Sequence, residues 1–449
     1  MCRVTWQHLR MRRLTPLLVS IAVVSAACAG SDSAEPATDD SVAPVTEPAP
    51  ATDQPPTDPP ATDPPATDPP ATDPPATDPP ATDPPATDPP VTEAPAEELA
   101  AFTPIGDGPY AVGVQTITIT DVERDRPLTV DVTFPLAEGA TGEPQRYTFI
   151  TGDYYESPRA VAATADQISP DGPFPLVVYT HGSGGLRYIH SDYTETIASH
   201  GYVVVAADHT GNTAVDQFLE QQDDGATIAY NRPRDVQVVI DEMFNPESLE
   251  TVGFVASVDP EKIAVTGHSL GGYATYAVAS GMSNAAGTVE ADPRIDALIP
   301  LAPALGSGDP DTSLLTDEQL AQVDVPTLVM VGTDDTSTPP SPNVDRAVEF
   351  TQSSPLYRVE LVAAEHQSFT DVCDYLEFFP TLENPTQAVL DTIEESAAEG
   401  CSEGDMPIER VKDITNTFAV SFLDSIFRDG EMVTDDNTEI PDDVIFAAK

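Results

Sequence analysis

Six short, unbroken apolar runs constrain the fold of this chain more than any other feature of its sequence. They occupy residues 176–179, 202–207, 263–266, 297–301, 327–331 and 359–363. Runs of this length are typical of strands buried on both faces of a parallel sheet. The segments between and after them have the pattern of helices, at residues 188–200, 233–244, 270–281, 342–352 and 408–428. This alternation predicts an α/β fold.

Two further strands are expected ahead of these runs. Residues 111–120 and 128–134 alternate apolar and polar side chains, the pattern of half-buried antiparallel strands joined by a turn. The predicted sheet is therefore mostly parallel and eight-stranded, with helices on both faces, and it belongs to one domain at residues 101–449. The remaining long segments are expected as excursions above the strand ends, at residues 140–172, 210–231 and 370–405.

Residues 28–100 have a different composition from the rest of the chain. The segment 31–100 holds 21 of the 47 prolines and 16 acidic residues, but no lysine or arginine. Within residues 57–90, Thr-Asp-Pro-Pro recurs seven times at a period of five residues. Proline fixes φ and removes a backbone donor, and little apolar surface is available to bury. We expect a disordered, extended tether, with a recognition motif for a proline-binding partner as the alternative.

Residues 1–27 have the pattern of an export signal. Arg10, Arg12 and Arg13 precede an apolar run at 17–27 that is too short to span a bilayer as a helix. Small residues end the run and Cys28 follows, which resembles a bacterial lipoprotein signal whose cysteine becomes the lipidated first residue of the mature chain. We expect an exported, surface-tethered protein that meets the membrane only through its lipid anchor, with ordinary secretion as the alternative.

The charge of the chain excludes one class of partner. The formal net charge is −56, and residues 101–449 alone carry 59 acidic and 15 basic residues, which leaves −44. A field of this sign repels phosphate backbones, and the sequence contains no basic patch. Nucleic-acid binding is therefore not expected, whereas a hydrated, carboxylate-rich surface is.

Two cysteines remain in the expected folded domain, Cys373 and Cys401. In an oxidising compartment, two cysteines 28 residues apart most simply form one disulfide, here in the late insertion at 370–405. Loop-closure entropy gives such a bond about 3 to 4 kcal/mol. Neither a metal ion nor another cofactor is expected.

The strongest chemical motif is Gly267-His268-Ser269-Leu270-Gly271, which lies directly after an expected strand and directly before an expected helix. In this context G-x-S-x-G forms a strained turn that exposes a nucleophilic serine above the sheet. Side chains in place of Gly267 and Gly271 would clash there. The motif predicts Ser269 as a nucleophile.

A serine hydroxyl needs a base, and the base needs a carboxylate to orient it. The order for this kind of turn is serine, acid, histidine. Only His366 follows Ser269 among the histidines, so it is the predicted base. Asp334 and Asp335 both follow the run at 327–331 and are both candidates for the acid.

Acyl transfer also needs donors for the developing oxyanion. The backbone N–H of Leu270, next to the nucleophile, is one expected donor. The second is expected from Thr180-His181-Gly182-Ser183-Gly184-Gly185, most simply the amide of Ser183. His181 is expected to brace this loop by hydrogen bonding. The loop lacks the G-K-[ST] continuation of a phosphate-binding loop, which argues against a nucleotide site.

These motifs together resemble the α/β-hydrolases, and among them the platelet-activating factor acetylhydrolase and predicted dienelactone-hydrolase-like group. The likeness covers roughly residues 108–428 and rests on six segments: GPYAVG, FPLVVYTHGSGGLR, ASHGYVVVAADHTGN, Arg232-Pro233 with Asp235, GHSLGGY, and GTDDTSTP followed by EHQSF. The resemblance implies that Asp335 is the acid, that the Ser183 amide completes the oxyanion hole, and that esters are hydrolysed without calcium or another cofactor. Ser269 stands where dienelactone hydrolases proper have cysteine, so diene lactones are not expected substrates.

The expected function is that of a surface-tethered serine hydrolase that cleaves small carboxylic esters or lipids through an acyl-enzyme intermediate. Acetylhydrolase and phospholipase A2-type activities fall within this class, and lipid degradation is an expected role. One alternative is an extracellular depolymerase of polyester or cutin-like polymers. Another is a binding lipoprotein that has a hydrolase scaffold but no catalysis. The sequence does not specify the acyl chain, the alcohol or the oligomeric state.

Overall fold

The computed structural model describes residues 99–248, 250–309 and 313–449. The expected signal at 1–27, the lipidation site Cys28 and all but the end of the expected tether at 28–100 lie outside the described residues. No described helix combines the length and the apolar character needed to cross a membrane.

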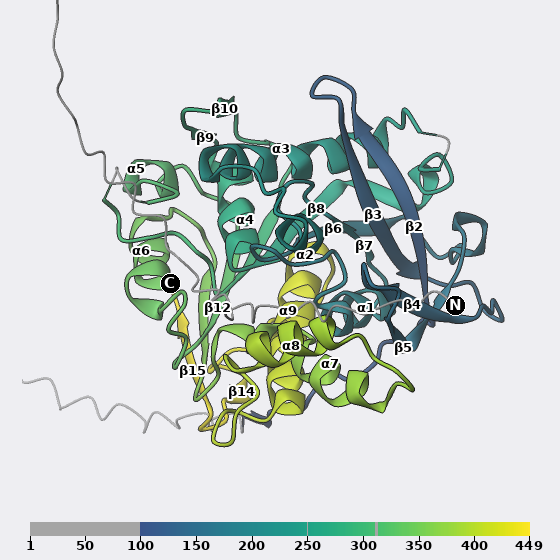
Figure 1. Cartoon of the computed structure of the whole chain (residues 1–449). Helices are drawn as coiled ribbons and strands as arrows, with labels where there is room; N and C mark the ends of the chain where they lie inside the picture. Colours follow the sequence, from purple (N-terminus) through teal and green to yellow (C-terminus); the bar gives the residue numbers. More distant parts are fainter. Residues whose placement is uncertain (1–98, 249, 310–312) are drawn as a thin grey trace, which may run out of the picture. The chain divides into compact units, whose positions relative to one another are not determined.

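Most strands of the described region form one large sheet, which helices cover on both faces (Figure 1). Two separate pairs are β1 (Ala100–Ala101) with β14 (Thr438–Glu439) and β9 (Met282–Ser283) with β10 (Thr288–Val289). The sheet has eleven strands in this region. In spatial order they are β15 (Val444–Ala448), β13 (Leu356–Leu361), β12 (Thr327–Gly332), β11 (Ala297–Leu301), β8 (Val258–His268), β6 (Phe174–Thr180), β7 (Val203–Ala207), β3 (Arg126–Pro135), β2 (Val112–Asp121), β5 (Tyr154–Ala162) and β4 (Pro144–Thr148). The six strands from β13 to β7 are parallel to one another. β15, β3 and β4 pair antiparallel with their neighbours, and β2 and β5 form a further parallel pair.

The α/β class and the mostly parallel sheet are confirmed, but the expected number of eight strands was too low. All eight expected strands are present, and β4, β5 and β15 extend the sheet at its two edges. These three strands are partly exposed, and Pro158 of β5 lies where the pairing with β4 is irregular, between the pairs Arg146–Glu156 and Pro144–Val161, a place that tolerates proline. Their mixed apolar and polar patterns hid them, so residues 144–162 are a strand pair and not an irregular excursion.

The five expected helices are also present. They are α1 (Ser191–Ser199), α3 (Gly225–Phe244), α4 (Leu270–Ser280), α6 (Pro340–Phe350) and α9 (Ile408–Phe427). Helix α3 begins eight residues before the expected start because Asp224 caps it and accepts hydrogen bonds from two first-turn amides. The expected excursions contain further short helices, α2 (Ala214–Phe218), α7 (Val372–Phe378) and α8 (Gln387–Ala397).

Alternate side chains of β6 show how the helices are divided between the faces. Leu176 and Val178 pack in one core with α3 and α4, whereas Val177 and Tyr179 pack in a second core with α1 and α9. Burial on both faces explains why β6 has an unbroken apolar sequence. The carboxyl ends of β8, β12 and β13 thus meet at one edge of a rigid, two-sided core.

Candidate active site

Ser269 lies at the turn between the end of β8 and the start of α4. Its φ is 59° and its ψ is −117°, a conformation that L residues rarely adopt and that costs roughly 1 to 3 kcal/mol. Backbone hydrogen bonds hold it there: Ser269 N–H donates to Leu301 O at 2.9 Å, and Ser269 O accepts from Tyr273 N at 3.1 Å and Ala304 N at 3.0 Å. The turn presents the hydroxyl beyond the end of the sheet.

The two glycines of the motif allow the neighbouring strand to approach closely. A Cβ atom at Gly267 would lie 2.5 Å from Thr180 O, and one at Gly271 would overlap the same oxygen. Neither position therefore accepts a side chain without moving β6. This is the steric reason that the sequence has G-x-S-x-G at this turn.

His366 and Asp335 lie next to Ser269 in a continuous line of hydrogen bonds. His366 Nε2 is 2.9 Å from Ser269 Oγ, and His366 Nδ1 is 2.8 Å from Asp335 Oδ2. His366 follows β13 and Asp335 follows β12, so each comes from the carboxyl end of a parallel strand. The structure thus brings together the three side chains that the sequence singled out.

Asp335 is buried and is held by more than the histidine. Thr338 donates its backbone N–H to Asp335 Oδ1 at 2.7 Å and its hydroxyl to Oδ2 at 2.9 Å. Burial disfavours the carboxylate, but the hydrogen bonds from His366 and Thr338 outweigh burial and hold the pKa of Asp335 below its ordinary value. The exposed Asp334 instead accepts a hydrogen bond from the Thr333 hydroxyl.

The two segments that carry the expected oxyanion donors both lie next to Ser269. Leu270 is the first residue of α4, and first-turn amides of a helix have no acceptor within the helix. The loop with Ser183 also approaches the nucleophile, because a Cβ atom at Gly182 would be only 3.4 Å from Ser269 Cβ. Both segments can therefore supply an amide to an oxyanion at Ser269.

Sequence reasoning missed the role of His268, the variable residue of the motif. His268 Nε2 lies 2.9 Å from His366 O, and the two rings pack at 4.6 Å. Burial holds the pKa of His268 well below its ordinary value, so the ring is neutral and its Nε2–H donates to this carbonyl. His268 therefore fixes the backbone of the catalytic-base candidate. Only the adjacency of His268 to Ser269 marked it in the sequence.

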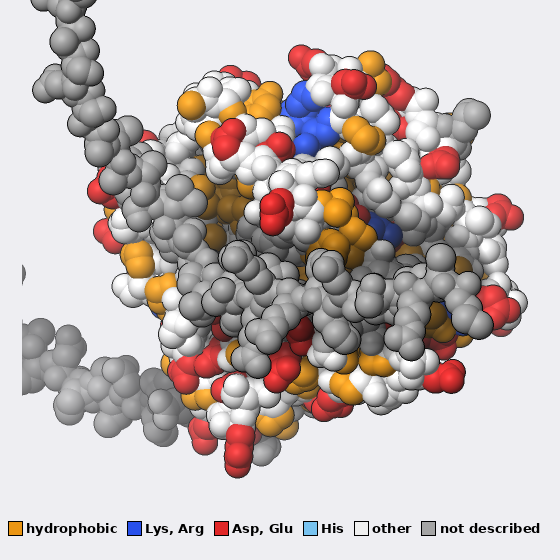
Figure 2. All heavy atoms as spheres, in the orientation of Figure 1, with side chains coloured by type: hydrophobic (Ala, Val, Ile, Leu, Met, Phe, Trp, Pro, Cys, Tyr) orange, Lys and Arg blue, Asp and Glu red, His pale blue; other side chains and the backbone are white. Residues whose placement is uncertain are grey.

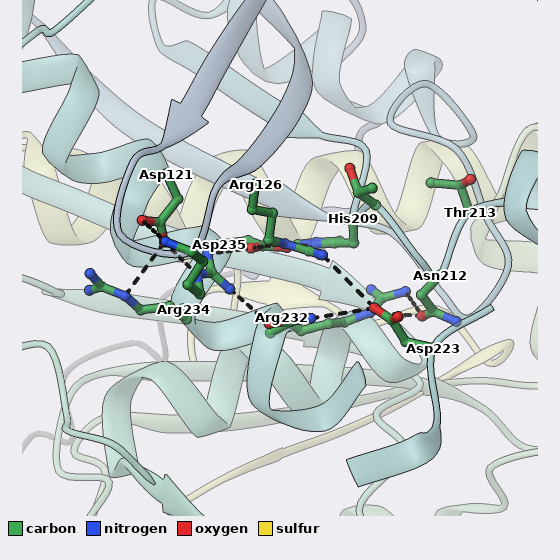
Figure 3. Close-up of polar contacts among 12 residues, drawn as sticks. Asp121, Arg126, His209, Asn212, Thr213, Asp223, Arg232, Arg234 and Asp235 are labelled. Atoms are coloured by element: carbon green, nitrogen blue, oxygen red, sulfur yellow. Dashed lines mark hydrogen bonds and ion pairs between the residues drawn. The ribbon is translucent and has the colours of Figure 1, made fainter. Parts of the chain in front are cut away.

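A second missed feature is a buried polar network beside the 180–185 loop (Figure 3). Asp235, Arg232 and His209 form its centre, and all three are buried. The sequence marked these residues only as part of a family resemblance. His181 belongs to the same network and braces its loop, as expected: its ring lies 2.7 Å from Gly182 O.

An apolar pocket of about 360 Å³ opens beside Ser269 and His366. Phe149, Tyr188 and Tyr375 are among the side chains that line it. Its walls come from residues 148–151, 182–189, 214–218, 366–375 and 388–396. Residues 370–375 and 388–396 belong to the late insertion, whose expected disulfide between Cys373 and Cys401 is present. Among the described residues, no group of three or more His, Cys, Asp or Glu side chains is placed to bind a metal ion.

Parts of this chain are similar in sequence to known proteins. Residues 136–233 match the family model described as platelet-activating factor acetylhydrolase, isoform II. A chlorophyllase type 0 from Chenopodium album is 32% identical over 33% of this chain, and a platelet-activating factor acetylhydrolase from Bos taurus is 24% identical over 27% of it. The matches span only 40% and 36% of the length of those two relatives.

The fold has a solved counterpart that covers more of the chain. A ferulic acid esterase from Streptomyces cinnamoneus superimposes with a TM-score of 0.56 at 20% identity, over 78% of this chain and 99% of that one. The α/β-hydrolase fold is therefore confirmed, and so is the resemblance to the platelet-activating factor acetylhydrolases.

Proposed function

We propose that this chain is a serine hydrolase that cleaves carboxylic esters through an acyl-enzyme intermediate. One observation carries the proposal: Ser269, His366 and Asp335 form an unbroken line of hydrogen bonds at the mouth of an apolar pocket. The names of the matched relatives, which include an acetylhydrolase and an esterase, support the same class of reaction.

In the proposed reaction the Ser269 hydroxyl attacks the ester carbonyl while His366 Nε2 takes its proton. The amides of Leu270 and Ser183 stabilise the oxyanion, and His366 returns the proton to the leaving alcohol. Water then attacks the acyl-enzyme with His366 as the base, which releases the acid and restores Ser269. Asp335 keeps the Nδ1 proton of His366 in place and stabilises the imidazolium.

The pocket and the charge together favour uncharged substrates. The walls beside Ser269 are mainly apolar, and residues 101–449 carry a formal charge of −44. Small neutral or zwitterionic esters, including lipids with short acyl chains, fit this combination better than anionic ones.

Export and anchoring through Cys28 complete the proposal and rest on the N-terminal sequence alone. Fractionation of cells tests the anchor: Cys28→Ser is expected to move the protein from the membrane fraction to the medium, and an unchanged distribution would contradict it.

Turnover of p-nitrophenyl esters from acetate to octanoate tests the reaction. Ser269→Ala is expected to lower kcat at least about 10⁴-fold without unfolding the protein, because the nucleophile is lost while the fold is kept. A fluorophosphonate probe is expected to label the wild type and not this variant. Equal turnover by the two proteins, or a wild type that the probe does not label, would contradict the proposal and favour a binding protein. Release of soluble acids from a polyester film, faster than from small esters, would favour a depolymerase.

A further inference from the structure

Arg232 is a fully buried arginine, with an exposed fraction of 0%, that lies behind the 180–185 loop. Its guanidinium donates to His181 O and, at 2.8 Å, to Gly182 O. It also donates to Asn212 Oδ1 at 2.5 and 3.0 Å (Figure 3). All of these acceptors are uncharged. Burial of a cation is costly, and directly bonded carboxylates usually offset that cost. Here the guanidinium N–H groups of Arg232 instead donate to backbone carbonyls of the 180–185 loop, which carries the expected oxyanion donor.

The bond to Gly182 O has a consequence for the amide of Ser183. These two groups belong to one peptide unit, which is planar and trans, so they point in opposite directions. Three donors hold the oxygen: Arg232, the His181 ring at 2.7 Å and Gly185 N–H at 3.2 Å. Fixing the oxygen on the buried side therefore directs the Ser183 N–H away from the protein interior. Gly182 itself packs against Ser269.

The His181 ring is a donor in this arrangement. His209 N–H donates to His181 Nε2 at 3.2 Å, so Nε2 carries no proton and Nδ1–H points at Gly182 O. Burial and the nearby Arg232 hold the pKa of His181 well below its ordinary value, which keeps the ring neutral. Asn212 adds a link on the other side, since its Nδ2 donates to Ser183 Oγ at 3.3 Å.

Asp235 supplies the negative charge that balances this region. It is fully buried and accepts from Arg124 at 2.7 Å, from Arg126 at 2.8 Å through each carboxylate oxygen, and from His209 Nδ1 at 2.9 Å. Burial disfavours the charged form of Arg232 and lowers its pKa to about 9, while Asp235 opposes that shift. Arg232 thus stays charged at neutral pH although none of its direct acceptors is a carboxylate.

We propose that Arg232 is a positioning residue for ester hydrolysis, which holds the Gly182 carbonyl so that the Ser183 amide faces the oxyanion and polarises that peptide with its charge. The inference rests on the proposed function. Hydrogen bonds in a chain strengthen one another, so a cation on the carbonyl makes the N–H of the same peptide a better donor. The hydrogen bond from the Ser183 N–H stabilises most when Ser269 Oγ bonds to the carbonyl carbon of the ester. The π electrons of that ester carbonyl then move to its oxygen, and the serine proton passes to His366.

Arg232→Lys tests this role, because lysine keeps the charge but loses the planar fork that bonds two carbonyls and Asn212 together. With p-nitrophenyl butyrate we expect kcat to fall about 10- to 100-fold while KM changes less than about twofold, since the lost interaction acts in the transition state. The inhibition constant of a trifluoromethyl ketone, whose adduct with Ser269 carries an oxyanion, is expected to rise by about the same factor as kcat/KM falls.

Arg346→Lys is the matched control. Arg346 is also a buried arginine that donates to backbone carbonyls, those of Gly306 at 2.8 Å and Leu315 at 2.9 Å, and it also pairs with Asp317. The control is expected to lower Tm as Arg232→Lys does, but to leave kcat and the inhibition constant within about twofold of the wild type. A merely structural role for Arg232 would make the two variants alike.

Two results would overturn the inference. One is a folded Arg232→Lys protein with wild-type kcat and inhibitor affinity, and the other is a loss that appears only in KM. If Arg232→Lys does not fold, Asn212→Ala decides, because it keeps the cation but removes the acceptor that orients it: a lower kcat at unchanged KM supports the inference, and a wild-type kcat overturns it. A wild type without Ser269-dependent turnover would instead overturn the proposed function, and the inference with it.

Discussion

Ionisable side chains in the interior of this domain include neutral histidines and charged carboxylates. His181 and His268 lie in apolar or cationic surroundings that lower their pKa, so they serve as neutral partners in hydrogen bonds. Asp235 and Asp335 keep their charge because hydrogen bonds and nearby cations outweigh the cost of burial. Neutral rings and fixed carboxylates around Ser269 hold one hydrogen-bond arrangement over a wide pH range.

Glu195 behaves differently and gives a pH-dependent stability. It is buried in α1 and accepts from the Tyr147 and Ser157 hydroxyls at 2.7 and 2.8 Å. Burial outweighs these hydrogen bonds and the nearby Arg159, and raises the pKa of Glu195 from 4.5 to about 7. Between these two values the folded domain keeps a proton that the unfolded chain has released, so this residue's contribution to stability falls as pH rises through that window.

Glu195→Gln is expected to remove this contribution, because glutamine keeps the shape but does not titrate. Between pH 5 and pH 8 the free energy of unfolding of the variant should fall by about 3 kcal/mol less than that of the wild type, since one pKa unit corresponds to about 1.4 kcal/mol. Urea denaturation at the two pH values measures the difference. The exposed Glu349→Gln is the control and should follow the wild type. Parallel pH profiles for wild type and Glu195→Gln would contradict the prediction.

At the scale of secondary-structure elements, the strand ends were the predictable part. Buried parallel strands have apolar sequences that stand out, and Ser269, Asp335 and His366 each follow one of them. The outer strands β4, β5 and β15, of which β4 and β15 form the two edges, were not predictable because partly exposed strands carry mixed sequences. Nor was the environment of Arg232, which depends on three segments that only the folded chain brings together.

The late insertion acts as an element with its own small core. Helices α7 and α8 pack against each other through Val372, Tyr375, Val389 and Ile393, and all four side chains also line the pocket. The disulfide joins Cys373 in α7 to Cys401, which follows α8. One wall of the pocket therefore depends on a covalent link that closes a loop between residues 28 positions apart.

Replacement of both cysteines by serine is expected to loosen this wall. Loop closure predicts a loss of about 3 to 4 kcal/mol, which we expect mainly in the insertion. KM for p-nitrophenyl octanoate should rise about tenfold while kinetics with the acetate, which needs less of the pocket, stay within about twofold. Steady-state kinetics with the two esters measure this. Equal losses with both esters would show instead that the insertion supports the triad itself.

At the scale of the whole domain, acidic residues far outnumber basic ones. Of the fifteen basic residues in 101–449, thirteen form ion pairs in the described region, while Arg232 and Lys449 donate to backbone carbonyls. Most of the excess carboxylates remain at the surface, and Figure 2 shows acidic side chains spread over the visible face with few basic ones among them. A substrate therefore approaches Ser269 through a negative potential.

This potential predicts how the reaction depends on substrate charge and on salt. We compare p-nitrophenyl pentanoate with the p-nitrophenyl monoester of glutaric acid, which has a similar length but carries a carboxylate. At roughly 0.01 M salt the Debye length is about 30 Å, and kcat/KM for the anionic ester should be at least about tenfold lower. At about 0.5 M salt the screening length is only a few ångströms, so the gap should narrow severalfold, while the neutral ester changes little and controls for effects on stability. A gap that is independent of salt would place the discrimination in the apolar walls of the pocket and not in the field of the domain.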